Sequence, residues 1–218
     1  MAGKLILLVE EPSMEAALDI LLPRMLGQDS DTEIDIVRFQ CKDDLLKKLP
    51  ERLRGYSAWL PSGWVLLVLI DRDGDDCRVL KQTLEHIAAE ARLVSKTTAG
   101  PGQPFQIVNR IAIEELEAWF FGDWAAVQAA YPRVPATIPK KTPYRDPDAI
   151  AGGTWEALER VLKQAGYFAT GLRKIECART IAAHMVPERN TSASFGALRE
   201  AVRAVVTQGV ATSGPGRS

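Results

Sequence analysis

Acidic side chains follow two apolar runs of this sequence. Glu10 comes directly after the run 5–9, and the sequence Asp-Arg-Asp-Gly-Asp-Asp, beginning at Asp71, comes directly after the run 64–70. Four carboxylates within six residues repel one another unless water or a divalent cation neutralises them, and oxygen ligands suit a hard ion such as Mg²⁺. The pattern therefore predicts a site for Mg²⁺ or Mn²⁺ with Glu10, Asp71 and Asp73 as ligands.

Two other interpretations fit parts of the acidic sequence. Asp71, Asp73 and Asp75 match the first, third and fifth positions of an EF-hand calcium loop. The match fails where that loop needs a glycine and a glutamate, because those positions hold Asp76 and Gln82. An acidic helix start explains Asp75 and Asp76, since carboxylates favour the positive end of a helix. We adopt the helix start for these two residues and the metal site for Asp71.

The elements that must position these acids alternate along residues 1–131. The periodicity predicts strands at 4–9, 33–39, 64–70 and 105–109. Helices are expected between them, at 13–25, 43–54, 76–94 and 113–131. Strands that alternate with helices predict a doubly wound, mostly parallel α/β sheet with helices on both faces. Ligands of such sheets bind at the carboxyl ends of strands, where Glu10 and Asp71 stand.

The remaining residues predict a different organisation. Residues 132–153 are rich in Pro, Lys and Asp, and we expect them to form an extended connector. A C-terminal helical extension is expected at 154–207, with helices at 155–165, 172–185 and 194–206, and a flexible tail at 208–218.

Charge is unevenly distributed although the net charge is only −1. Residues 1–123 contain 14 basic and 21 acidic side chains, whereas residues 124–218 contain 13 and 7. The basic half fits an anionic partner such as nucleic acid, or a solvated surface. Lys174 and Arg173 are the expected phosphate-binding residues, because Lys174 starts a predicted helix, where the helix dipole does not favour a cation.

Composition excludes several classes of protein. The cysteines, Cys41, Cys77 and Cys177, are scattered and form no C-x-x-C pair, which argues against structural zinc and suits a reducing cytoplasm. His86 and His184 are too few for chemistry built on several histidines. No apolar run approaches the roughly 18 residues that a membrane-spanning helix needs. We therefore expect a cytoplasmic protein without a membrane segment.

The order and spacing of several motifs resemble a known group of proteins. Val-Glu at 9–10 and Asp-Arg-Asp at 71–73 resemble the two motifs of the Toprim fold, which topoisomerases, bacterial primases and OLD-family nucleases share. The segment 113–123, IEELEAWFFGD, resembles a helix of the DUF4276 group of Toprim-like proteins. The similarity continues through Gly-Tyr at 166–167, Gly-Leu-Arg-Lys at 171–174 and Ser-Ala-Ser-Phe at 192–195, and so covers almost the whole chain.

This resemblance implies that the first glutamate acts as a general acid, general base or metal ligand, and that the Asp-x-Asp pair holds Mg²⁺. A small nuclease is the expected member of the group. A topoisomerase needs a nucleophilic tyrosine on a second large domain, and a primase usually carries a zinc module. The resemblance further implies an effector linked to a partner ATPase in bacterial or phage defence, although the chain has no phosphate-binding loop of its own.

The segment 113–123 adds one glutamate to the expected catalytic residues Glu10, Asp71 and Asp73. Glu115 and Glu117 would lie about 200° apart around a helix, so only one can face the site, and we favour Glu117. The chain also departs from the group's pattern. Glu11 stands where glycine is common, and the acid that usually follows is replaced by Met14, with Glu15 one position later.

Two functions from other classes remain open at this point. A phosphoacceptor receiver also gathers acids around Mg²⁺ at strand ends, but it needs an aspartate acceptor and a lysine after a fifth strand. Glutamates at 10 and 11 and the basic helical extension argue against it. The third possibility is a catalytically silent module that binds nucleic acid.

Overall fold

The computed structural model describes residues 3–27 and 30–212. Its centre is a four-stranded sheet in the order β2-β1-β3-β4, and all neighbouring strands are parallel. The strands are β1 (Lys4–Val9), β2 (Glu33–Arg38), β3 (Trp64–Asp71) and β4 (Ile107–Ala112). The predicted parallel α/β sheet is confirmed, and its fourth strand begins two residues later than we expected.

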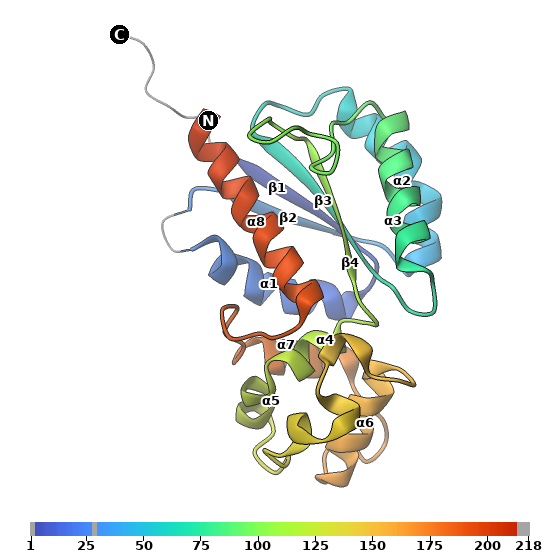
Figure 1. Cartoon of the computed structure of the whole chain (residues 1–218), viewed down its shortest axis with the longest axis vertical. Helices are drawn as coiled ribbons and strands as arrows, with labels where there is room; N and C mark the ends of the chain where they lie inside the picture. Colours follow the sequence, from blue (N-terminus) through green and yellow to red (C-terminus); the bar gives the residue numbers. More distant parts are fainter. Residues whose placement is uncertain (1–2, 28–29, 213–218) are drawn as a thin grey trace.

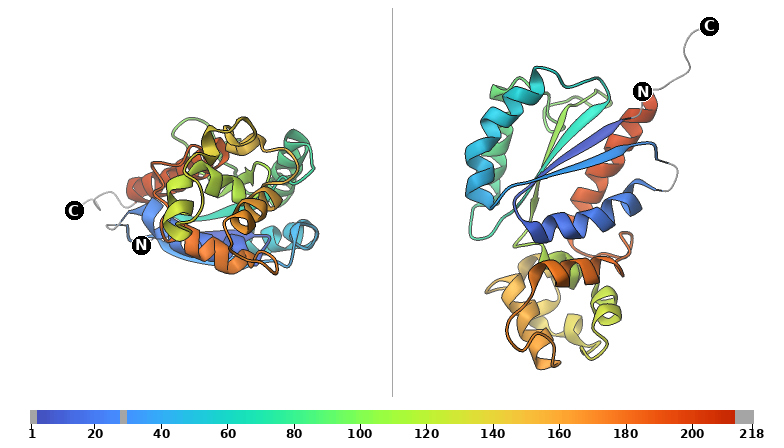
Figure 2. Two further views of the ribbon diagram at one scale, coloured as in Figure 1. Left: turned by 90° about the horizontal axis from the view of Figure 1, so that it is seen from below. Right: turned by 180° about the vertical axis from the view of Figure 1, so that it is seen from behind.

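Helices cover both faces of the sheet (Figures 1 and 2). One face carries α1 (Pro12–Leu26) and α8 (Ala193–Thr212), and the other carries α2 (Lys42–Ser57) and α3 (Cys77–Glu90). Because side chains alternate along a strand, β1 contributes Leu5 and Leu7 to one apolar core and Ile6 and Leu8 to the other. The predicted helices on both faces are thereby confirmed.

Four shorter helices lie beyond the carboxyl end of β4, at the lower end of the molecule in Figure 1. They are α4 (Glu117–Gly122), α5 (Trp124–Ala130), α6 (Thr154–Gln164) and α7 (Lys174–Ala182). The prediction of a single helix over 113–131 is wrong, because the helix is interrupted at Asp123, between α4 and α5. The buried Asp123 carboxylate accepts hydrogen bonds from Val186 N and from the Arg189 guanidinium, which hold this residue out of helical geometry.

The segment 132–153 is not continuously extended. It contains three short 3₁₀ helices, at Ile138–Lys140, Thr142–Tyr144 and Pro147–Ala149. Proline lies at one of the first two positions of each, where its missing N–H costs no helical hydrogen bond. The last helix, α8, returns along the sheet and continues to Thr212, so that residues 208–212 are helical. The rest of the predicted tail, 213–218, lies outside the described residues.

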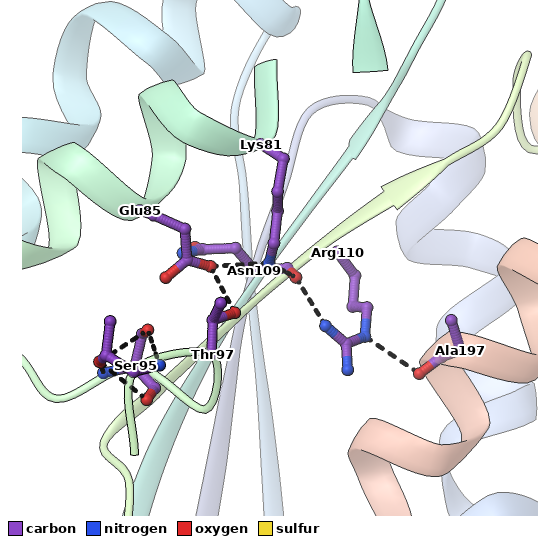
Figure 3. A network of polar contacts seen from close by, with 8 residues as sticks. Lys81, Glu85, Ser95, Thr97, Asn109, Arg110 and Ala197 are labelled. Atoms are coloured by element: carbon purple, nitrogen blue, oxygen red, sulfur yellow. Dashed lines mark hydrogen bonds and ion pairs between the residues drawn. The ribbon is translucent and has the colours of Figure 1, made fainter. Parts of the chain in front are cut away.

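β4 is an edge strand whose outer side is partly covered. The carbonyl oxygen of Asn109 accepts hydrogen bonds from Lys81 Nζ at 2.7 Å and Arg110 Nη1 at 3.0 Å (Figure 3). The Asn109 side chain donates to Glu85, and Arg110 Nε donates to the carbonyl of Ala197 in α8. These contacts fix α3 and α8 against the edge of the sheet.

Candidate functional site

The strand order brings Glu10 and Asp71 to the same edge of the sheet. β1 lies between β2 and β3, so the chain leaves β1 towards one side and later returns on the other. Such a reversal point at the carboxyl ends of parallel strands is the usual ligand position in doubly wound folds. Glu10 follows β1 and Asp71 ends β3. Both side chains therefore stand at the position where the fold is expected to bind a ligand.

An open pocket of about 600 Å³ lies at this edge. Its lining includes Glu10, Asp71 and Asp73 from the ends of β1 and β3. It also includes Lys42 from α2 and Lys174 from α7. The pocket is therefore bounded by the sheet, by a helix on one face and by a helix of the C-terminal part.

The carboxyl groups of Glu10 and Asp71 are removed from solvent. Their residues are 5% and 4% exposed, and Glu10 Oε2 and Asp71 Oδ1 have no hydrogen-bond partner among the described residues. Burial, followed by the charge of Asp73, raises the pKa of Glu10 to about 7. Burial and the neighbouring Glu10 raise the pKa of Asp71 well above its usual value. A bound cation would offset this desolvation and repulsion.

Glu117 and Glu115 have different environments. Glu117, the first residue of α4, is 2% exposed, and its Oε2 has no partner among the described residues. Burial raises its pKa to about 8, and its charge in turn raises the pKa of Asp71. Glu115 precedes α4, so the expectation that one helix carries both glutamates is wrong. Its Oε2 accepts three hydrogen bonds of 2.9 Å from Thr154 and Trp155 at the start of α6.

Asp73 lines the pocket but already has a cationic partner. Its Oδ2 lies 2.7 Å from Lys42 Nζ, and Asp75 Oδ2 lies 2.9 Å from the same nitrogen. Asp76 caps α3, accepting from the backbone N–H groups of Arg78 and Val79, so the helix-start interpretation is confirmed for Asp76. Asp75 directly precedes this cap, and its side chain pairs with Lys42.

Sequence reasoning did not identify Lys42. The signal that could have found it is positional, because Lys42 opens the helix that follows β2. The carboxyl end of β2 lies at the same edge of the sheet as the ends of β1 and β3.

The two predicted phosphate-binding residues, Lys174 and Arg173, differ in their surroundings. Lys174 lines the pocket, and its ammonium lies 4.9 Å from the centre of the Trp155 ring. Burial acts to lower the pKa of Lys174, but the charges of Glu117 and Glu11 outweigh it and raise that pKa. Arg173 is largely exposed and forms an ion pair with Glu176 at 3.1 Å.

The residues that depart from the DUF4276 pattern, Glu11, Met14 and Glu15, each make contacts within the fold. Glu11 precedes α1 and accepts a hydrogen bond from the Ser13 hydroxyl. Met14 is fully buried in the core, and Glu15 pairs with Arg38 at 2.9 Å.

The motif at 192–195 connects α8 to the helices below the sheet. Ser194 Oγ accepts from Trp119 Nε1 at 3.1 Å, and the Phe195 ring packs edge-on against the Trp119 ring at 5.3 Å. The Asp148 carboxylate accepts from the Ser192 and Ser194 hydroxyls. Trp119 and the aromatic residues near it, Phe120, Phe121 and Trp124, are buried and belong to the core.

The three predicted metal ligands do not converge by themselves. Within residues 3–27 and 30–212, no group of three or more His, Cys, Asp or Glu side chains is arranged to hold a metal ion. Glu10 and Asp71 lie together, whereas Asp73 is paired with Lys42.

None of the helices within residues 3–27 and 30–212 combines the length and the apolar character that crossing a membrane requires.

A comparison with known protein families gives a match over most of the chain. The family model DUF4276, described as a domain of unknown function, matches residues 9–203. Comparison with curated proteins and with solved structures gave no match. The matched range contains Glu10, Asp71, Glu117 and both lysines of the pocket.

Proposed function

The chain belongs to the DUF4276 family, and from this premise and the pocket we propose a Mg²⁺- or Mn²⁺-dependent nuclease. It would hydrolyse phosphodiester bonds of DNA or RNA. The observation that carries the proposal is the pair of adjacent buried carboxyl groups, Glu10 and Asp71, each with an oxygen that has no partner among the described residues. The likeness of the two motifs to the Toprim fold agrees with this chemistry.

The two carboxyl groups fit a magnesium ion better than other cofactors. Mg²⁺ in proteins is often held by one or two carboxylates, keeps several waters and binds substrate phosphates, so a complete protein cage is not required. Glu10 and Asp71 would supply the direct ligands, and Asp73 is a third carboxylate at the same pocket. When bound, the ion would activate a water molecule and stabilise the charge of the departing oxygen.

The other side chains of the pocket suit a phosphodiester substrate. In the metal-free protein the pKa of Glu10 is raised to about 7, and a bound ion would hold Glu10 in the ionised form that a ligand needs. Lys174 brings a second positive charge to the pocket besides Lys42, and its ammonium can contact a substrate phosphate. Glu117 is an electrostatic neighbour of Lys174, and each side chain shifts the pKa of the other. Arg173 would contribute phosphate contacts outside the pocket.

The resemblance to Toprim-like proteins also suggests a partner protein for this chain. On this basis the proposal includes a partner ATPase and a role in phage defence. Cleavage that increases when a purified ATPase encoded beside this chain is added would support the link. Unchanged cleavage would remove the ATPase and leave the nuclease.

The receiver alternative gains no support from the geometry. Asp71 is 4% exposed, and the sheet of the described residues has four strands, whereas a receiver needs a lysine after a fifth. Incubation with acetyl phosphate and Mg²⁺ separates the two functions. A stable aspartyl phosphate at Asp71 would favour the receiver.

The nuclease is tested by incubating mixed single- and double-stranded DNA and RNA with the protein and Mn²⁺. We expect cleavage by the native chain and by Asp31→Asn, an exposed residue before β2 at the other end of the sheet. Cleavage should be lost in Asp71→Asn and in EDTA. Binding without cleavage in every variant would instead indicate a silent nucleic-acid-binding module.

A further inference from the structure

The Lys42 ammonium occupies a position that resembles a cation site. Three oxygens of the loop after β3 surround Nζ: Asp73 Oδ2 at 2.7 Å, Asp75 Oδ2 at 2.9 Å and the Arg72 carbonyl oxygen at 2.9 Å. The Lys42 side chain is 12% exposed, although most of this loop faces solvent. Two carboxylates and a carbonyl are also the groups that a divalent ion would take from such a loop.

The acidic loop explains the position of Lys42, whereas its helix does not. Lys42 is the first residue of α2, and a cation is unfavourable at the positive end of a helix dipole. The loop also has an unusual backbone, since Asp73 has φ +50° and donates its N–H to the carbonyl of Glu114 at 2.9 Å. The loop is thus held both by the segment after β4 and by its three contacts with the ammonium group.

We propose that Lys42 is a tethered cation that takes the place of a second divalent ion in this pocket. The pocket then binds one ion, at Glu10 and Asp71, while the carboxylates of Asp73 and Asp75 are committed to Lys42. This inference rests on the proposed function, because it assigns the number of ions that the proposed nuclease uses.

Electrostatics explains why the two cations exclude each other. Ions in two-metal nucleases lie about 3.5–4 Å apart and share bridging carboxylates. A second ion bound by Asp73 would have to displace the ammonium from Oδ2 or lie beside it, and two positive charges at such a distance repel strongly in a partly buried pocket. Removing the charge of Lys42 would release two carboxylates in the same loop.

The test counts bound Mn²⁺ by calorimetric titration and by electron paramagnetic resonance of the free ion. Lys42→Gln removes the charge, and Lys42→Arg keeps it. The matched control is Lys48→Gln, on the same helix, which removes an ion pair with Asp44 outside the pocket. We expect one ion per chain for the native protein, Lys42→Arg and Lys48→Gln. We expect two for Lys42→Gln, with the second lost in Lys42→Gln/Asp73→Asn.

Several results would overturn the inference. Two ions in the native protein, or one ion of unchanged affinity in Lys42→Gln, would contradict it. If Lys42→Gln does not fold, the Mn²⁺ affinity of Asp73→Asn, in the otherwise native chain, tests the inference instead. A tethered-cation role leaves the affinity for the single ion nearly unchanged, whereas loss of a direct ligand abolishes its binding or weakens it by more than about 100-fold, the upper end of what loss of an outer-shell contact costs.

The titration also separates this inference from the proposed function. If the native chain binds no Mn²⁺ but Lys42→Gln binds one ion that needs Asp73, the tethered cation stands and the ion at Glu10 and Asp71 is rejected. If neither protein binds Mn²⁺, both are rejected.

Discussion

Glu10 and Asp71 lie side by side because β1 and β3 are paired in register. Val9 is the partner of Leu69, which places Glu10 one position and Asp71 two positions beyond the pair. Both carboxyl groups are buried, and the charge of Glu10 is the largest cause after burial of the raised pKa of Asp71. A pair of buried acids without a cation destabilises the fold, so its presence indicates a use for it.

Glu10→Gln is expected to separate stability from metal binding. The change keeps the shape of the side chain and removes one negative charge from a repulsive cluster, so the melting temperature in EDTA should stay equal or rise. Millimolar Mn²⁺ should raise the melting temperature of the native chain, because a ligand that binds only the folded state stabilises it. That increase should disappear in Glu10→Gln and persist in Asp31→Asn. A lower melting temperature in EDTA would instead indicate that Glu10 serves as a helix-start residue.

Stability without metal should fall as the pH rises. The pKa of Glu117 is about 8 in the folded protein against 4.5 as its ordinary value, so the folded state keeps a proton that the unfolded chain has released between those values. The contribution is fully present below pH 4.5 and is lost as the pH passes 8, and Glu10 acts in the same direction up to about pH 7. Urea unfolding of Glu117→Gln in EDTA should show a smaller loss between these pH values, by on the order of 2 to 4 kcal/mol.

The control for this prediction is Glu51→Gln, an exposed residue of α2. Its unfolding free energy should follow the same pH dependence as the native chain. An unchanged slope in Glu117→Gln would show that the Glu117 carboxyl group is ionised in the folded protein at neutral pH.

Binding of nucleic acid should depend on salt, and Lys174 should contribute to the dependence. Each phosphate contact releases counterions, so affinity falls as the salt concentration rises. Lys174→Ala should reduce the slope of log affinity against log salt by about one contact. Arg173→Ala should change it less, because Arg173 is paired with Glu176 and lies outside the pocket. Equal slopes for Lys174→Ala and the native chain would remove Lys174 from the phosphate contacts.

We expect Asp123 to contribute strongly to the stability of the C-terminal part of the protein. Its side chain is 1% exposed and holds Arg189 through two hydrogen bonds, of 2.7 and 2.9 Å. Asp123→Ala leaves Arg189 and the N–H of Val186 without this partner, and we expect a loss of about 2 to 4 kcal/mol in the free energy of unfolding. Glu188→Ala breaks only an exposed pair with Arg203 and should cost less than about 1 kcal/mol. Similar losses in both variants would contradict the role of Asp123.

The parts of the fold that follow from local pattern could be read from the sequence. Apolar runs marked β1 and β3, alternation marked β2, and the acids after β1 and β3 marked the edge of the sheet. Lys42 could not be identified in this way, because its contact with Asp73 depends on which strand lies beside which. The roles of Glu115 and Asp123 were hidden for the same reason, since their partners at Thr154 and Arg189 are brought in by tertiary packing.

The most direct measurement of the central claim is cleavage of a labelled polynucleotide in Mn²⁺ by four proteins at equal concentration. These are the native chain, Glu10→Gln, Asp71→Asn and Asp31→Asn, each shown to be folded by its melting curve in EDTA. The account predicts that the native chain and Asp31→Asn cut the substrate and that EDTA stops them. Glu10→Gln and Asp71→Asn should bind the substrate without cutting it. Cleavage by Asp71→Asn at the native rate, or no Mn²⁺-dependent cleavage by the native chain, would contradict the account.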